Sequence, residues 1–148
     1  SENIKPSSVI SLFRQNTGSG LKGIKEEDYR RISELMQYCI STGKGEIYGI
    51  EISGKLIYAV FVVNFAGRLT LLFTATGPES RNSRSGYLVT DHIIHKYAAK
   101  NYLLDFAGSS IPSIASYIRS FGAVEETYYR LYRNKLPLPF RYFKPSKP

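Results

Sequence analysis

The sequence predicts an α+β fold in which a mixed, mainly antiparallel sheet carries helices on both faces. Two observations support this class. Three apolar, strand-like segments follow one another between residues 46 and 76 with tight turns between them, as in an antiparallel meander. Beyond residue 76 the order changes to loop, helix and strand, which is the pattern of a crossover connection.

The N-terminal part is predicted to hold two helices. Ser7 or Ser8 could cap a brief first helix, because a serine oxygen accepts hydrogen bonds from the N–H groups of a first turn. From Glu26 to Ile40, apolar residues recur every three or four positions and acids occupy the first turn, where the helix dipole favours negative charge. This pattern predicts an amphipathic helix that ends at Thr42-Gly43.

The meander is predicted to consist of the strands Glu46–Ile52, Lys55–Asn64 and Arg68–Thr76. Its middle strand is apolar on both faces from Leu56 to Val63, as expected for a central strand that is covered on both sides. Helices must therefore lie on both faces of the sheet.

From residue 77 onward we expect a loop, a helix, a strand, a helix and a strand. The first of these two strands is a short apolar run between turn formers, so it is predicted to be buried and to lie near the third strand of the meander. The predicted ranges are Gly77–Gly86, Tyr87 to about Lys100, Tyr102–Phe106, Pro112–Gly122 and about Glu126–Arg133.

A length of 148 residues suits one domain, residues 1–148, of which residues 134–148 form a basic, proline-rich C-terminal extension. The single cysteine, Cys39, excludes an internal disulfide. The longest apolar stretch, Leu56–Ala66, is much shorter than the roughly 20 residues of a membrane-spanning helix. We expect a cytoplasmic protein with no membrane span.

The formal net charge of +8 is concentrated at the C-terminal end. Residues 130–148 contain six bases and no acid: Arg130, Arg133, Lys135, Arg141, Lys144 and Lys147. With the aromatic residues between them, these bases could contact a single-stranded nucleic acid such as part of a tRNA. The alternative is a strap whose aromatics pack on the domain while the bases stay in water.

The loop before the helix at Tyr87 is the strongest candidate for a binding site. The first turn of a helix has N–H groups without intrahelical acceptors and the positive end of the dipole, which together favour phosphate. Arg81 and Arg84 add positive charge there, and Ser83, Ser85 and Gly86 allow close approach to the backbone. The alternative is a solvated connection without a ligand.

The stretch Arg81-Asn82-Ser83-Arg84-Ser85-Gly86 resembles the pyrophosphate loop of the GNAT superfamily of N-acyltransferases, whose pattern is Arg or Gln, x, x, Gly, x, Gly or Ala. The first and last positions agree, whereas Arg84 replaces the first glycine. The resemblance implies that acetyl-CoA or another acyl-CoA is the co-substrate and that residues 81–86 bind its phosphates.

A second resemblance is to the FemAB-like branch and related bacterial GNAT-like proteins. It is carried by the stretch Leu104–Ser109, by Ile114-Ala115 and by Phe121-Gly122-Ala123. This branch implies transfer of an acyl or aminoacyl group to an amine, with aminoacyl-tRNA as the donor in some members. It also implies that the chain could be the C-terminal half of a tandem protein; a homodimer is the other assembly that we consider.

The GNAT resemblance also implies where donor and acceptor lie. The third strand and the strand at Leu103–Phe106 would splay apart, and backbone groups of Phe73, Thr74 and Ala75 would contact the pantetheine arm. Asp105 and Ser109 are candidates to orient the acceptor or relay a proton; the alternative is a backbone-bonded aspartate and a helix capped by Ser109 or Ser110. The general-acid tyrosine of the family aligns with Ile118, and Tyr117 beside it is a further catalytic candidate.

His92 and His95 lack a third ligand at suitable spacing, so we expect no metal. The sequence therefore predicts an N-acyltransferase that moves an acyl group from acyl-CoA to an unidentified amine. Two alternatives stay open: an aminoacyl transferase that uses aminoacyl-tRNA, and a non-catalytic GNAT-like half that serves as a binding module.

Overall fold

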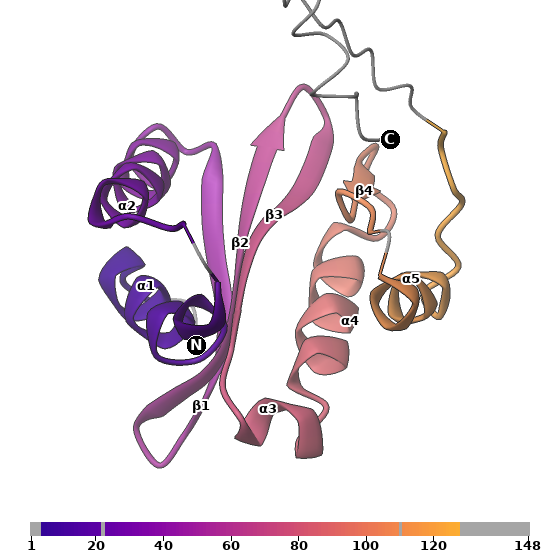
Figure 1. The fold of residues 1–148 in the computed structure, drawn as a ribbon. Helices are drawn as coiled ribbons and strands as arrows, with labels where there is room; N and C mark the ends of the chain where they lie inside the picture. Colours follow the sequence, from indigo (N-terminus) through magenta and orange to yellow (C-terminus); the bar gives the residue numbers. More distant parts are fainter. Residues whose placement is uncertain (1–3, 22, 110, 128–148) are drawn as a thin grey trace, which may run out of the picture. The chain divides into compact units, whose positions relative to one another are not determined.

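The computed structural model describes residues 4–21, 23–109 and 111–127. The chain divides into two compact units, Ser1–Ser110 and Ile111–Pro148. The first unit holds a four-stranded sheet in the order β1-β2-β3-β4 (Figure 1). Its elements are α1 (Pro6–Gln15), a 3-10 turn (Gly18–Gly20), α2 (Glu26–Ser41), β1 (Gly45–Ile52), β2 (Lys55–Phe65), β3 (Arg68–Thr76), α3 (Glu79–Asn82), α4 (Ser85–Tyr97) and β4 (Leu103–Asp105).

The sheet confirms the predicted meander and crossover. β1 pairs with β2 and β2 with β3 in antiparallel register, whereas β4 pairs with β3 in parallel. A parallel neighbour requires a crossover, which α3 and α4 supply. The strand at Leu103 thus lies beside the third strand of the meander, as predicted. Its predicted burial is wrong: Leu103 is 51% exposed, and Leu104 and Asp105 are half-buried, because within the described chain β4 pairs with β3 alone and forms the edge of the sheet.

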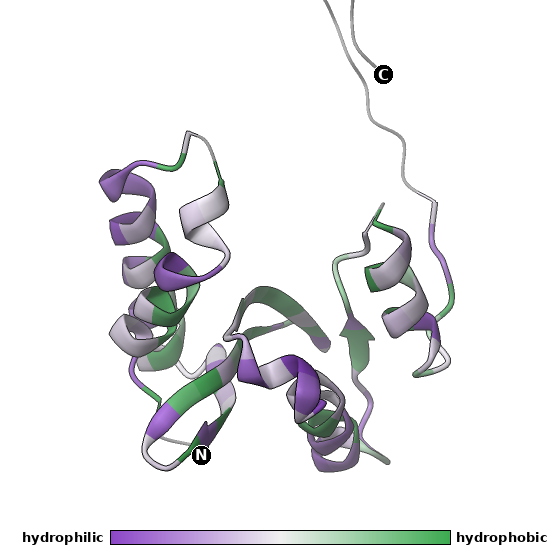
Figure 2. Cartoon of the chain, turned by 60° about the horizontal axis from the view of Figure 1, so that its bottom comes forward, coloured by the Kyte–Doolittle hydropathy of each residue, from purple (hydrophilic) through white to green (hydrophobic). Residues whose placement is uncertain are grey.

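Helices cover both faces of the sheet, with α1 and α2 on one side and α4 on the other (Figure 1). Side chains of β2 alternate between the two cores, because successive residues of a strand point to opposite faces. Ala59 and Phe61 pack with buried residues of α1 and α2, among them Cys39, whereas Val60 and Val62 pack against α4. Figure 2 shows apolar residues on the sides of α1 and α2 that face the sheet.

The predicted serine cap of the first helix is wrong. α1 begins at Pro6, and Lys5 is its N-cap without a side-chain hydrogen bond. Proline is favoured in a first turn because its fixed φ suits the helix and its missing N–H would have no acceptor there. The predicted end of α2 is confirmed, since Thr42 caps the helix and Gly43 follows with a φ of +68°.

The crossover contains more helix than predicted. Four residues of the expected loop, Glu79–Asn82, form α3, and α4 begins at Ser85 rather than Tyr87. The polar composition of Gly77–Gly86 suggested an open loop, but its serines satisfy local backbone carbonyls and so permit helical turns.

The second unit contains α5 (Pro112–Arg119). Ile111 is its N-cap and makes no side-chain cap, so the alternative role of Ser109 as the cap of this helix is excluded; Ser110 lies outside the described residues. Glu126 and Thr127 are not part of a strand, and the rest of the predicted strand, with the extension 134–148, lies outside the described residues. In the part of the chain that is described, no helix has the length and apolar character to cross a membrane.

Candidate functional site

The edge of β3 that faces β4 is open over most of its length. β4 pairs only with Arg68, Leu69 and Thr70. Within the described chain, residues 71–76 of β3 therefore have β2 on one side and no strand on the other. An unpaired strand edge offers backbone N–H and C=O groups that an extended ligand could bind.

The register shows which residues offer these groups. The N–H of Gly77 donates to the carbonyl of Ile57 at 2.7 Å, and backbone groups of alternate residues in a strand point the same way. Phe73 and Ala75 therefore direct their backbone groups toward β2. Thr74 and Thr76 direct theirs toward the open edge, and the Thr74 side chain is exposed.

A β-bulge lies at the start of this open edge. The register shifts between Phe61 and Val62, so that Leu72 is an extra residue in β3 and its side chain is 45% exposed. Bulges bend a strand and increase its twist. The bulge thus turns β3 at the point where its pairing with β4 ends.

The chain continues from the open edge into the predicted phosphate loop. Arg84, the N-cap of α4, has φ +52° and ψ +33°, in the left-handed region that favours glycine. Arg84 occupies the position where the GNAT pattern has its first glycine, so the backbone adopts the conformation that glycine would readily take. The N–H groups of Tyr87 and Leu88 donate to the Arg84 carbonyl and close the first turn of α4.

The serines of this segment hold its shape. Ser83 Oγ lies 2.6 Å from Ser85 Oγ and donates to the carbonyl of Glu79 at 3.1 Å, while Ser80 Oγ donates to the carbonyl of Gly77 at 2.8 Å. The Ser85 side chain is 0% exposed. The side chains of Arg81, Asn82 and Arg84 are exposed instead.

Positive charge on this segment is not neutralised by a nearby acid. Its one carboxylate, Glu79, accepts a hydrogen bond from Lys55 Nζ at 2.7 Å, and this bond lowers the pKa of Glu79. In the described residues, neither Arg81 nor Arg84 forms an ion pair. Arg81 belongs to α3 and Arg84 is the N-cap of α4, so both precede the end of α4 whose dipole favours an anion.

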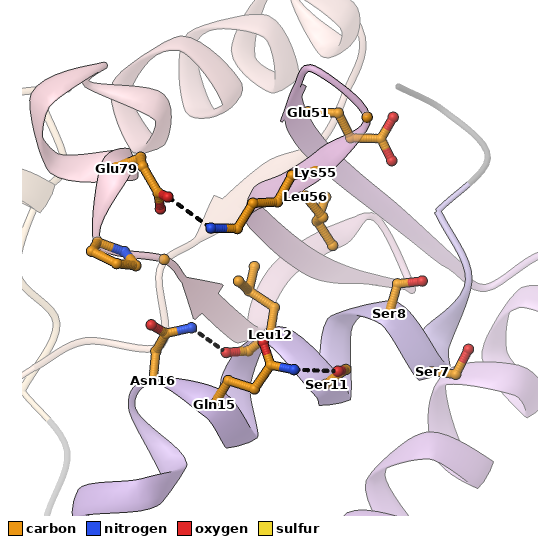
Figure 3. A pocket seen from close by; sticks show the side chains of 13 residues that line it. Ser7, Ser8, Ser11, Leu12, Gln15, Asn16, Glu51, Lys55, Leu56 and Glu79 are labelled. Carbon is orange, nitrogen blue, oxygen red and sulfur yellow. Dashed lines mark hydrogen bonds and ion pairs between the residues drawn. The ribbon is translucent and has the colours of Figure 1, made fainter.

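A polar pocket of about 560 Å³ lies between α1, the β1–β2 hairpin and the start of α3 (Figure 3). The Lys55–Glu79 ion pair joins the hairpin to α3 beside this pocket. Because its strand residues come from β1 and β2, the pocket lies on the β2 side of Gly77, whereas the open edge of β3 faces the other way.

Asp105 lies at the end of β4 with both carboxylate oxygens engaged. Arg68 Nη1 donates to Oδ2 and the N–H of Ala107 donates to Oδ1, each at 2.8 Å. Burial raises the pKa of Asp105, but the hydrogen bonds from Ala107 and Arg68 outweigh it and leave the pKa below its ordinary value. The carboxylate is thus a weak base near neutral pH.

The other two catalytic candidates, Ser109 and Tyr117, belong to different units of the chain. Ser109 is half-buried at the end of the first unit. Tyr117 lies on α5 in the second unit, where its ring packs edge-on against Phe121 with 5.2 Å between centroids. Among the described residues, no three or more His, Cys, Asp or Glu side chains form a group that could hold a metal ion.

A polar cluster on the α4 face of the sheet was not predicted. Lys96 Nζ donates to Glu46 Oε2 at 2.7 Å, Tyr97 OH donates to Glu46 Oε1 at 2.8 Å, and Tyr48 OH also donates to Glu46. Burial and the neighbouring Glu46 carboxylate raise the pKa of Tyr97. In sequence Glu46 resembles any solvated first residue of a strand, and only the packing of α4 over β1 brings Lys96 to it.

Several solved structures of acetyltransferases share this fold. A predicted acetyltransferase with acetyl-CoA from Clostridium acetobutylicum aligns with a TM-score of 0.65 and 13% identity, over 88% of this chain and 90% of that one. A possible acetyltransferase from Clostridium difficile 630 aligns with a TM-score of 0.64 and 12% identity, over 93% and 96%. A ribosomal-protein-alanine N-acetyltransferase from Brucella melitensis biovar Abortus 2308 aligns with a TM-score of 0.60 and 12% identity, over 88% and 94%.

The fold is therefore that of the GNAT acyl-CoA N-acyltransferases, as the resemblance implied. At these identities the likeness concerns the fold alone. No protein-family model and no curated protein matches the sequence.

Proposed function

We propose that this protein is an N-acyltransferase that transfers an acyl group, acetyl in the simplest case, from acyl-CoA to an amine acceptor. The observation that supports this most is the continuity of two features: the open edge of β3 runs directly into a segment in which Arg81 of α3 and Arg84, the N-cap of α4, form no ion pair with a described residue. An extended amide-bearing arm and a phosphate group, joined in one donor molecule, match these features in order.

In this proposal the phosphates of the donor bind along Arg81–Gly86. The guanidinium groups of Arg81 and Arg84 form charge-assisted hydrogen bonds with them, and the buried Ser85 maintains the loop. The pantetheine arm pairs with the backbone of Thr74 at the open edge, while Phe73 and Ala75 keep β3 attached to β2.

The chemistry is attack of a neutral amine on the thioester carbonyl. The C–N bond forms, the C–S bond breaks, the amine loses a proton and the CoA thiolate gains one. Positioning of the two reactants supplies much of the rate. Asp105, Ser109 and Tyr117 are the proposed candidates to orient the acceptor or transfer a proton; the lowered pKa of Asp105 makes its carboxylate a weaker base than an ordinary aspartate.

Titration of the protein with CoA tests the donor site. We expect calorimetric binding and a rise in melting temperature, since a ligand at a hundred times its Kd stabilises the folded state by about 2.7 kcal/mol. Arg81→Ala and Arg84→Ala are each expected to weaken CoA binding about ten-fold, because a hydrogen bond to a charged group contributes about 1.5–3 kcal/mol.

Arg31→Ala is the matched control. It removes an exposed arginine that pairs with Glu27 on α2, remote in sequence from the loop. It is expected to leave CoA affinity unchanged. A melting curve that does not shift at millimolar CoA would count against the proposed donor.

Finer assignments belong to the same proposal. We propose that residues 1–148 form one GNAT-like domain of a cytoplasmic protein from the bacterial FemAB-like branch, and that a tandem GNAT-like half or a second copy completes the acceptor pocket. The competing proposals are an aminoacyl-tRNA donor and a non-catalytic binding half. Transfer of a labelled amino acid from aminoacyl-tRNA, without transfer from acetyl-CoA, would favour the first of these.

A further inference from the structure

β4 stops pairing with β3 where the Asp105 side chain captures a backbone donor. The parallel ladder begins with the N–H of Leu103, which donates to the carbonyl of Gly67 at 2.9 Å, and its last residue pair is Thr70–Asp105. In a parallel pair, alternate residues of one strand donate to alternate carbonyls of the other. The next rung of this register would join the N–H of Ala107 to the carbonyl of Leu71.

That rung is replaced by a side-chain contact. The N–H of Ala107 donates to Asp105 Oδ1 at 2.8 Å instead. Arg68 Nη1 binds the second oxygen, Oδ2, at the same distance and so holds the carboxylate in place. The side chain of Asp105 thus competes with the sheet for a backbone N–H, as Asp and Asn side chains commonly do in turns.

The backbone after β4 then turns away from β3. Ala107 and Gly108 have φ of +59° and +66°, in the left-handed region. For a non-glycine residue this conformation is sterically unfavourable, and at Ala107 the hydrogen bond to Asp105 offsets part of that cost. A strand cannot continue through two such residues, so the edge of β3 beyond Thr70 stays open.

We propose that Asp105 is a positioning residue that ends the pairing of β4 with β3 at Thr70 and thereby maintains the opening for the donor beyond that pair. In this role the carboxylate acts on the backbone of its own strand and does not touch the reacting atoms. The identity of the donor rests on the proposed function, whereas the end of the pairing does not.

Two substitutions at Asp105 separate this role from an ionic or a catalytic one. Asp105→Asn keeps an oxygen that accepts from Ala107 and loses the charge; Asp105→Ala loses both. Arg68→Gln removes the ion pair and leaves the Asp105–Ala107 bond. Asp91→Ala is the control, since Asp91 is an exposed aspartate on α4.

The direct readout is the scalar coupling across a hydrogen bond between the nitrogen of Ala107 and the carbonyl carbon of Leu71, measured by NMR without ligand. We expect no coupling in the wild type, in D105N, in R68Q or in the control, and a resolved coupling in D105A because the released N–H completes the next rung. CoA affinity by calorimetry is expected to fall ten-fold or more in D105A and to stay within about three-fold of wild type in the others.

Other outcomes overturn the inference. A ten-fold loss of affinity in D105N or R68Q would assign the effect to charge. A fall in kcat with unchanged CoA affinity in D105N would assign Asp105 to proton transfer. A loss of affinity in D105A without the new hydrogen bond would mean that Asp105 acts on the donor by another route.

The NMR measurement does not depend on the proposed function, because it is made without ligand. If the wild type does not bind CoA, the donor assignment fails, yet the coupling in D105A still reports whether Asp105 ends the pairing of β4 with β3. If D105A does not fold, D105N and R68Q carry the test: both must lack the coupling and keep the wild-type CoA affinity, and a loss in either overturns the inference.

Discussion

Arg84 combines an unfavourable backbone conformation with a side chain suited to anion binding. Its φ of +52° falls where glycine has no steric cost and arginine does. Such residues commonly lie at functional sites, where strain is retained because the side chain or the geometry is needed. At Arg84 the strained backbone would be retained because it comes with a positively charged side chain at the N-cap of α4.

The first prediction follows from this conformation. Arg84→Gly is expected to increase the free energy of unfolding by about 0.5–1 kcal/mol, since it removes a steric cost of about 1–2 kcal/mol and adds flexibility to the unfolded chain. Arg81→Gly is the matched control, because Arg81 lies within α3 and glycine there should cost about 0.5–1 kcal/mol. Urea denaturation measures the free energy of unfolding of both variants. Changes of the same sign in R84G and R81G would contradict the explanation.

The second prediction concerns Glu46. Burial raises its pKa, but hydrogen bonds from Lys96, Tyr48 and Tyr97 together leave the pKa below the ordinary 4.5. A carboxylate with a depressed folded-state pKa stabilises the protein above its unfolded pKa, and this contribution is lost as the pH falls through the folded pKa.

Glu46→Gln should therefore destabilise the protein at pH 7 and much less at about pH 3. We expect a difference of about 1 kcal/mol at pH 7, because the Glu46 side chain is 44% exposed and solvent screens it. Glu51→Gln, at an exposed position of the same strand, is the control. Urea denaturation across this pH range measures the effect. A loss of stability in E46Q that does not change with pH would contradict a role for the charge of Glu46.

At the scale of elements, the packing of β1 depends on a missing side chain. A Cβ atom at Gly49 would lie 2.5 Å from the carbonyl oxygen of Tyr58 and 2.5 Å from Ile4 Cδ1. The first of these is backbone and cannot move without disturbing the β1–β2 pairing. Gly49→Ala is expected to cost about 2 kcal/mol, in the range of other overpacked sites.

Gly20→Ala is the control for this third prediction, since its Cβ would meet nothing within 4 Å. Its effect should stay within about 0.5 kcal/mol. Thermal unfolding of the two variants under the same conditions measures the contrast. Similar melting temperatures for G49A and wild type would show that β1 accommodates the methyl group.

Elements with a strong apolar period could be predicted from the sequence, as the meander shows. Lys55 to Asn64 was predicted as a central strand, and the structure extends it by one residue. The helical turn at Glu79–Asn82 could not be predicted, because Ser80 within it and Ser83 after it are residues favoured in loops as well as in local hydrogen bonds to the backbone.

For the candidate site, the sequence predicted which segments contribute to it. It did not predict the direction in which their backbone groups and side chains point. Which backbone groups of β3 face its open edge depends on the register with β2, which the structure gives through the paired residues and the Gly77–Ile57 hydrogen bond. Likewise, composition predicted that Asp105 lies near the end of a strand. Its contact with Arg68 depends on the pairing of β3 with β4, and its contact with the N–H of Ala107 depends on the turn that follows β4.

At the scale of the whole molecule, the net charge of +8 arises mostly from the six bases of residues 130–148. Neutralisation of phosphates by such bases makes affinity fall steeply with salt. If the tail contacts tRNA, the protein should be retained on heparin or tRNA, and Arg141→Ala with Lys144→Ala should lower the salt concentration needed for elution.

The same double variant separates the tail from the donor loop. CoA affinity should stay unchanged, because the proposed phosphate contacts come from Arg81 and Arg84. Retention that persists in the double variant, measured in the same salt gradient, would assign polyanion binding to another part of the surface.

The attachment of β4 by three residue pairs has a consequence for the local stability of the sheet. Native proteins open in parts, and the elements with few partners open at the lowest free energy. Amide hydrogens of residues 103–105 should exchange with solvent through such partial opening, whereas those of β2, which has a strand on each side, should require global unfolding. A molecule that bridges β3 and β4 would raise the opening free energy of β4 selectively, so protection factors along this strand would report donor binding residue by residue.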